Sequence, residues 1–230
     1  MKILELIENL HKYPLFTIGD LTKITGQPAT SVRIVASRLV KRRVIKRIER
    51  NKYTFHDEPL IFASYIIYPS YIGLWAALRF HNLTTQIVRE IDVIVPKSRK
   101  DLIFMGNKIH FTKTRNIWGF YKGTYLGFEI FISDIEKTII DCILSGVQAS
   151  VILEAIKTGP IDEDKLFEYT AKVNSFSLFK RLGFILEKAG FDTQRYVSKI
   201  DNHYIKLNPS GREKGVLNKK WKIIENEAII

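Results

Sequence analysis

Residues 27–41 read QPATSVRIVASRLVK, and their apolar side chains recur with a period that a helix brings onto one side. At about 100° per residue, that side collects Val32, Val35, Ala36 and Leu39. Pro28 suits the first turn, because the N–H that proline lacks would have no partner inside a helix there. We therefore expect a helix from about Pro28 to Lys41 that packs on a core through its apolar side.

The opposite side of this helix is polar and basic. It carries Thr30, Ile34, Ser37 and Lys41, with Arg33 and Arg38 at its edges. In a DNA major groove, arginine and lysine reach guanine or phosphate, hydroxyl groups reach base edges or phosphate, and an aliphatic group can touch the thymine methyl. The alternative is an ordinary surface helix whose charged side is only solvated.

Neighbouring segments give this helix the setting of a winged helix-turn-helix. Apolar spacing predicts one helix over residues 2–12 and another from Thr17 or Gly19 to Gly26. The connection to the next helix is short, as in the helix-turn-helix motif, whose second helix enters the groove. Alternation over residues 45–55 then predicts a hairpin that turns at Asn51-Lys52. This hairpin is the predicted wing, and its outward cations are Lys46, Arg47, Arg50 and Lys52.

Positive charge is concentrated in the same part of the chain. Residues 1–55 hold twelve Lys and Arg against four Asp and Glu, whereas the remaining residues hold 24 against 20. A surface that is only solvated has no reason for this asymmetry, so we expect the segment to bind double-stranded DNA. The expected contacts are Thr30, Ser31, Arg33, Ser37, Arg38, Lys41, Arg42, Arg43, Lys46, Arg47, Arg50 and Lys52.

The whole chain has a formal charge of +12 and a sequence pI near 9.6, which also favours a polyanionic partner. No apolar run reaches the length of about 18 residues that a membrane-spanning helix needs. Glu5 and Glu8 interrupt what would be the apolar core of a signal peptide, and the single Cys142 suits a reducing compartment. We expect a cytoplasmic protein without membrane contact, with Cys142 turned toward a core.

The rest of the chain predicts a larger mixed domain, so the expected fold class is α+β with domains at 1–57 and 58–230. Strands are expected at 90–95, 102–105 and 108–112, and a hairpin at 119–132 with Gly123 near its turn and with Leu126, Phe128, Ile130 and Ile132 on one face. Ser70 is expected to cap a helix that runs to His81. Ser133 and Glu136 have the spacing of a capping box for another helix. Further helices are expected at 150–157, 163–173 and 176–190, and short strands in the tail.

No catalytic, metal or cofactor site is expected. The five histidines have no metal-ligand spacing, and the acids near Lys137 are explained as a capping box and by the helix dipole. The loop 208–215 lacks the Gly-Lys-Ser/Thr ending of a phosphate-binding loop.

Four blocks occur in order along the chain: YPSYIGLWAALRFHNLT, IDVIVPKSRKDLIFMGNKIHF, FEIFISDIEKTIIDCI and FKRLGFILEKAG. Together with the N-terminal segment they resemble the AbiEi family, the antitoxins and autoregulators of type IV toxin-antitoxin systems. The resemblance extends from about Met1 to Gly190. It implies that the first domain binds operator repeats, and that the second counters a nucleotidyltransferase-like toxin without forming a stable complex with it.

Two other hypotheses stay open at this stage. The chain would be a nuclease or nucleotidyltransferase if Asp92, Asp101 or Glu129 held a metal ion. It would be a regulator or adaptor without a toxin if its second domain bound a protein partner or RNA.

Overall fold

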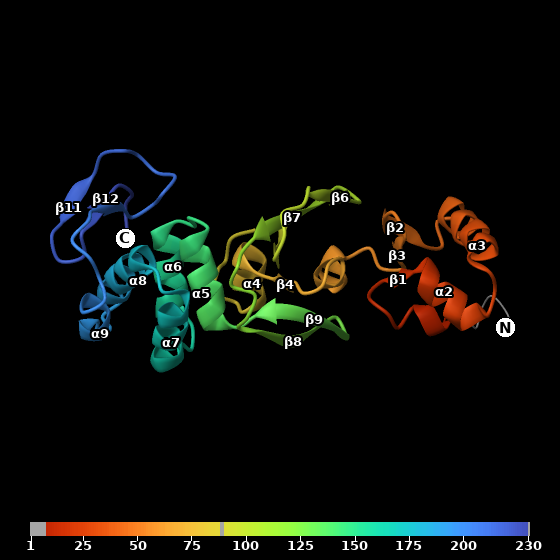
Figure 1. The fold of residues 1–230 in the computed structure, drawn as a ribbon, viewed down its shortest axis with the longest axis horizontal. Helices are drawn as coiled ribbons and strands as arrows, with labels where there is room; N and C mark the ends of the chain where they lie inside the picture. Colours follow the sequence, from red (N-terminus) through yellow and green to blue (C-terminus); the bar gives the residue numbers. More distant parts are fainter. Residues whose placement is uncertain (1–7, 88–89, 230) are drawn as a thin grey trace. The chain divides into compact units, whose positions relative to one another are not determined.

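The computed structural model describes residues 8–87 and 90–229 (Figure 1). These form two compact units: the first holds residues 8–72, 90–117 and 121–132, and the second holds 73–87, 118–120 and 133–229. Helices and several sheets occur together, so the expected α+β class is confirmed. The sequence predicts a separate domain that ends at Asp57. Whether residues 1–57 fold independently stays a prediction. Residues 2–7 of the first expected helix lie outside the described residues.

Two consecutive helices lie in the N-terminal part of the first unit. α2 (Ile18–Thr25) begins at Thr17, whose hydroxyl accepts from the Asp20 N–H while the Asp20 carboxylate accepts from the Thr17 N–H. It ends at Gly26, whose φ of 67° suits a residue without a Cβ. α3 (Ala29–Lys41) follows, so the helix expected over 28–41 is confirmed to within one residue.

Three short strands complete this part. β1 (Phe16–Thr17), β2 (Lys46–Glu49) and β3 (Lys52–Thr54) form an antiparallel sheet in the order β1-β3-β2. The expected hairpin is confirmed, but it turns at residues 50–51, where Asn51 takes the left-handed conformation that asparagine tolerates. β1 was not expected, because two residues are too few to display a period. The core beneath the helices consists of Leu10, Phe16, Ile18, Leu21, Val32, Ala36, Leu39, Ile45 and Phe55.

A six-stranded sheet in the order β6-β7-β5-β4-β9-β8 dominates the rest of the first unit. Its strands are β4 (Tyr71–Ile72), β5 (Glu90–Val95), β6 (Leu102–Phe104), β7 (Asn107–Lys113), β8 (Phe120–Tyr125) and β9 (Phe128–Ser133). Alternate residues of β5 and β7, among them Val93 and Phe111, pack on Phe62 and Ile66 around the 3-10 turns η1 (Pro59–Ile61) and η2 (Ala63–Tyr65). Ile48 of β2 belongs to the same apolar cluster.

The hairpin of β8 and β9 turns later than the sequence predicted. Gly123 is buried within β8, and the turn is made by Leu126 and Gly127, which have φ values of 48° and 82°. Leu126 is therefore exposed and not part of the apolar face. Ile130 and Ile132 do lie in the core, as expected.

The second unit is mostly helical. α5 (Ile135–Leu144) is buried on all sides from Glu136 to Ile143 and packs against four other helices. These are α4 (Leu74–Phe80), α6 (Ala149–Thr158), α7 (Glu163–Val173) and α8 (Phe176–Lys188). The short helix α9 (Gln194–Val197) and a sheet of β10 (Ile205–Lys206), β12 (Ile223–Glu225) and β11 (Val216–Asn218) follow.

Two predicted helix caps are wrong. Ser70 does not start α4, which begins after Gly73; its hydroxyl donates to the carbonyls of Ser64 and Ile67. At α5 the cap is Asp134, which accepts from the Lys137 N–H at 2.8 Å. Ser70 lies three residues before the cap position Gly73, and Ser133 lies one residue before Asp134. The Ser133 hydroxyl is engaged with the Thr138 hydroxyl at 2.7 Å. Among the described residues, no helix is long and apolar enough to cross a membrane.

Candidate nucleic-acid interface

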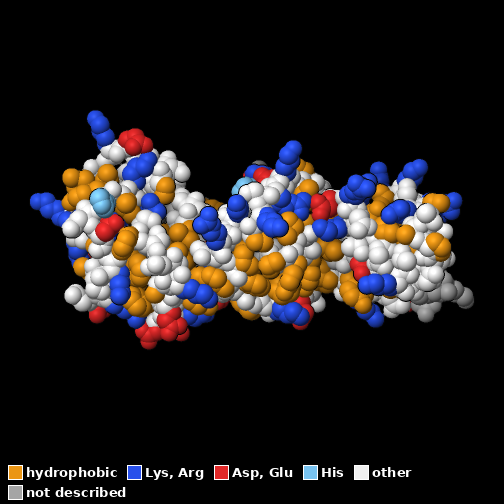
Figure 2. Space-filling model, in the orientation of Figure 1, with side chains coloured by type: hydrophobic (Ala, Val, Ile, Leu, Met, Phe, Trp, Pro, Cys, Tyr) orange, Lys and Arg blue, Asp and Glu red, His pale blue; other side chains and the backbone are white. Residues whose placement is uncertain are grey.

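α3 presents the side chains that the sequence assigned to DNA. Val32, Ala36 and Leu39 are at most 7% exposed, whereas Ile34 on the opposite side is 56% exposed. The other outward residues are all exposed, and Figure 2 shows several Lys and Arg side chains standing out over this N-terminal part, at the right of the view. They are Thr30, Ser31, Arg33, Ser37, Arg38 and Lys41, followed by Arg42 and Arg43 just after the helix.

A groove of about 1000 Å³ lies beside the start of α3. α2, α3 and the hairpin all contribute to it, and its charged lining is entirely basic: Lys23, Arg33, Arg47 and Arg50. None of these four makes an ion pair with a carboxylate in the described part of the chain. The groove is therefore suited to an anionic ligand of extended shape.

The first turn of α3 adds to the positive potential of this groove. Pro28 precedes the helix and provides no side-chain cap, and no acidic residue lies in the first turn. The N–H groups of that turn carry the positive end of the helix dipole, which favours phosphate. Ala29 lines the groove, so this end of the helix borders it.

The hairpin is fixed to α2 by its turn. The Asn51 side chain accepts a hydrogen bond at 3.1 Å from the N–H of Ile18, the first residue of α2. The adjacent Arg50 and the nearby Arg47 are both exposed, and the Nε of Arg47 donates to the Glu49 carbonyl at 3.2 Å. The two arginines are thereby held at one wall of the groove.

Two of the four expected wing cations are not outward. Lys46 is half-buried, donates to the Phe55 carbonyl at 3.0 Å and pairs with Asp57 at 2.8 Å. Lys52 is also half-buried and bonds to Glu49 and to the Ile66 carbonyl. Strand alternation predicts only which side of the hairpin a side chain faces. It did not predict these contacts, because the partners lie outside the hairpin or on its bulged strand β2.

Lys23 lines the groove but is not among the DNA contacts that the sequence predicts. It lies in the last turn of α2. Its position two residues after Leu21 already turns it away from the core.

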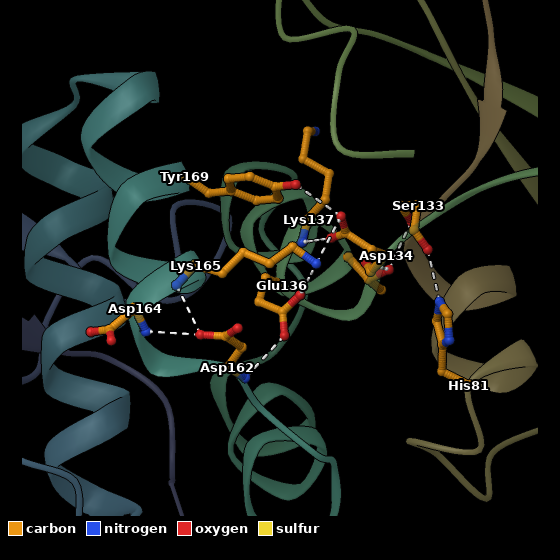
Figure 3. Close-up of polar contacts among 10 residues, drawn as sticks. His81, Ser133, Asp134, Glu136, Lys137, Asp162, Asp164, Lys165 and Tyr169 are labelled. Atoms are coloured by element: carbon orange, nitrogen blue, oxygen red, sulfur yellow. Dashed lines mark hydrogen bonds and ion pairs between the residues drawn. The ribbon is translucent and has the colours of Figure 1, made fainter. Parts of the chain in front are cut away.

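A second candidate is the polar cluster at the start of α5, drawn in Figure 3. Asp134 Oδ2 accepts from the Tyr169 hydroxyl at 3.0 Å and pairs with Lys165 Nζ at 3.2 Å. Glu136 pairs with the same Lys165 at 2.7 Å and accepts from the Asp162 N–H at 3.0 Å. Glu136 therefore ties α5 to α7, and its predicted role in a capping box is wrong.

Electrostatics in this cluster follow from burial and pairing. Burial would lower the pKa of Lys165, but hydrogen bonds and ion pairs with Glu136 and Asp134 raise it. Burial and the hydrogen bond to Asp134 raise the pKa of Tyr169 to about 12. Each group is thereby held in its ordinary charge state at neutral pH, which suits a structural clamp better than proton transfer.

Lys137 directly follows Glu136, is fully buried and pairs with Asp141 one turn further along α5. Burial lowers the pKa of Lys137, and the neighbouring Asp141 carboxylate opposes this shift. The ammonium also lies 5.0 Å from the ring centre of Trp118. These contacts satisfy the lysine from within the second unit.

The acids proposed as metal ligands are separated or already engaged. Asp101 accepts from His110 Nδ1 at 2.9 Å and from the Phe111 N–H at 3.2 Å, while Glu129 pairs with Lys122 at 2.8 Å. The His110 hydrogen bond is the main reason that the pKa of Asp101 lies below its ordinary value. Asp92 is buried on β5. Over residues 8–87 and 90–229, no three His, Cys, Asp or Glu side chains are placed to hold a metal ion.

Comparison with known proteins adds no assignment. The chain matches no protein-family model, and no curated protein is significantly similar to it.

Proposed function

We propose that this protein is a sequence-specific DNA-binding repressor that inserts α3 into the major groove and holds the backbone with the β2–β3 hairpin. The observation that carries the proposal is the pairing state of its cations. Arg33, Arg38 and Lys41 on α3 and Arg50 on the hairpin make no ion pair with any described carboxylate. A positive surface that leaves its charges unpaired retains a potential that attracts a polyanion.

The arrangement of elements supports a winged helix-turn-helix. α2 and α3 are separated by three residues, and a hairpin follows in the chain. The thirteen residues of α3 extend over about 20 Å, and the major groove admits a helix of this kind. The exposed Ile34 is placed to contact a thymine methyl in such a complex.

The resemblance to the AbiEi family supports a more specific proposal. The protein would repress its own operon by binding operator repeats, and its second unit would counter a nucleotidyltransferase-like toxin without holding it in a stable complex. We propose no reaction for the chain, since Asp134 and Glu136 pair with Lys165 of α7 and Asp141 pairs with Lys137 within α5. Co-expression with a toxin from the adjacent reading frame should relieve growth arrest only if the second unit is present.

Fluorescence anisotropy of the full-length protein tests the DNA-binding proposal. Labelled duplexes from the region upstream of its own gene are compared with shuffled duplexes over a range of salt concentrations. If four to six phosphates are neutralised, log affinity should fall with log salt at a slope of roughly −3.5 to −5.5. The upstream DNA should bind about 10³-fold more tightly or better. A slope near zero, or equal affinity for both duplexes, would contradict the proposal.

A further inference from the structure

Glu49 connects the hairpin to a loop of the large sheet within the first unit. One carboxylate oxygen accepts from Lys52 Nζ at 2.8 Å, and the other accepts from Arg99 Nη2 at 2.8 Å. Burial would raise the pKa of Glu49, but the hydrogen bonds from these two cations lower it. The carboxylate is thus charged at neutral pH and bridges the two segments.

Packing reinforces this connection. The Arg99 guanidinium lies 4.2 Å from the ring centre of Phe111 on β7, and Ile48 on β2 is buried in the same apolar cluster as Phe111. Leu15, just before β1, packs against that cluster as well. The hairpin and the sheet therefore share a core, and the loop that carries Arg99 has a defined place beside the hairpin.

That loop, residues 96–101, reads PKSRKD and carries two lysines besides Arg99, the residue that connects it to the hairpin. Arg99 is occupied by Glu49 and Phe111, whereas Lys97 and Lys100 are exposed. Neither lysine pairs with a carboxylate among the residues that the structure describes. Their Cα atoms lie within about 7 Å of that of Arg99, because two residues of chain reach no further.

From this juxtaposition we propose that Lys97 and Lys100 extend the DNA-binding surface beyond the hairpin, by contacting phosphates next to those held by Arg47 and Arg50. The inference rests on the proposed DNA binding and adds a second contact segment from the large sheet. It places the footprint of the protein partly outside the winged helix. The competing explanation is a solvated loop that plays no part in binding.

Salt dependence of binding by the full-length protein tests the inference. Changing both Lys97→Ala and Lys100→Ala should remove two phosphate contacts, which lowers the magnitude of the salt slope by about 1.8. The loss should be equal on upstream and shuffled duplexes, because phosphate contacts carry no sequence information. A matched control changes Lys157→Ala and Lys199→Ala, two exposed lysines of the second unit, and should leave the slope unchanged.

The outcomes separate the two proposals. If the unmodified protein binds DNA with a steep salt slope but the Lys97/Lys100 variant keeps that slope, the loop is only solvated and the inference is wrong. An equal decrease in the control variant would also overturn it, because the effect would then follow net charge alone. If the unmodified protein shows no salt-dependent binding, the proposed function itself fails.

Discussion

Replacing Asp141 by asparagine should destabilise the second unit strongly, and more at pH 7 than at pH 9. Lys137 and Asp141 lie one turn apart on α5 and form an ion pair, with side-chain exposures of 0% and 4%. Asparagine keeps the shape of the carboxylate but removes the charge that balances the ammonium. Removing one partner of a buried pair usually costs about 3–5 kcal/mol.

The pH dependence arises because a buried Lys137 that has lost the Asp141 charge can lower the cost of its burial by losing its proton. Neutralising a lysine with an ordinary pKa near 10.4 requires about 4.6 kcal/mol at pH 7 and about 1.9 kcal/mol at pH 9. These values are upper limits for the penalty in the variant. Because Lys137 would then be neutral when folded and protonated when unfolded, stability of the variant should rise with pH relative to the unmodified protein.

Urea unfolding followed by circular dichroism at pH 7 and pH 9 measures this difference. Asp164→Asn is the matched control, since Asp164 pairs with Arg195 but its side chain is 89% exposed. The control should change stability by less than about 1 kcal/mol at both pH values. A penalty of under about 1 kcal/mol for Asp141→Asn, or an equal penalty at both pH values, would refute the burial argument.

The remaining stability predictions concern single residues of the second unit, with one comparison in α2 of the first unit. Cys142→Ser should cost about 1–3 kcal/mol and leave DNA binding intact, because Cys142 is fully buried on α5; rapid labelling of the native thiol by a bulky reagent would contradict this. Gly183→Ala should destabilise by about 1–3 kcal/mol, because the new Cβ would lie 2.2 Å from the ring of Trp221, whereas Gly19→Ala in α2 meets nothing closer than 3.4 Å and should be neutral or stabilising in thermal unfolding. Burial lowers the pKa of His81 although its ring donates to the Ser133 carbonyl at 2.7 Å, so stability should fall as pH falls below about 6.5, by at most about 1.4 kcal/mol per pH unit. His81→Gln should make this acid slope shallower, and an unchanged slope would assign it to other groups.

Sequence patterns predicted the elements whose signal lies within a few consecutive residues. Residues 90–95 form β5 as expected, because EIDVIV is dense in β-branched residues. The orientation of α3 was also predictable, because three apolar residues at helical spacing face the core and so define which side of the helix is exposed. Both predictions depended only on residues within the element.

Features set by distant contacts were not predicted. Ser133 and Asp134 are both good capping residues, and what separates them is that the Ser133 hydroxyl bonds to Thr138 while its carbonyl accepts from His81. Glu136 had the correct spacing for a capping box, but its carboxylate pairs with Lys165 of α7 and accepts from the N–H of Asp162, the residue that caps α7. Local spacing cannot distinguish such residues from true caps.

The same limit applies to the candidate interface. Lys46 and Lys52 alternate along the hairpin as surface residues do, yet each reaches an acceptor elsewhere in the first unit. Lys23 lines the groove because α2 lies beside the hairpin, where the Ile18 N–H of α2 donates to the Asn51 side chain. Charge content indicated which segment would carry a basic surface, whereas only the tertiary structure shows which of its cations are exposed and unpaired.

The most direct test of the account compares Arg33→Ala with Arg47→Ala on upstream and shuffled DNA at two salt concentrations. Both arginines line the same groove, so their loss changes its charge equally and only base contact should distinguish them. Arg33, on α3, should discriminate bases by about 1–3 kcal/mol, so its loss should weaken binding to upstream DNA more than to shuffled DNA. Arg47, on the hairpin, should weaken both equally and reduce the salt slope by about one. If Arg47 proves to be the discriminating residue and Arg33 the uniform one, the hairpin and not α3 recognises the sequence, and the central claim is wrong.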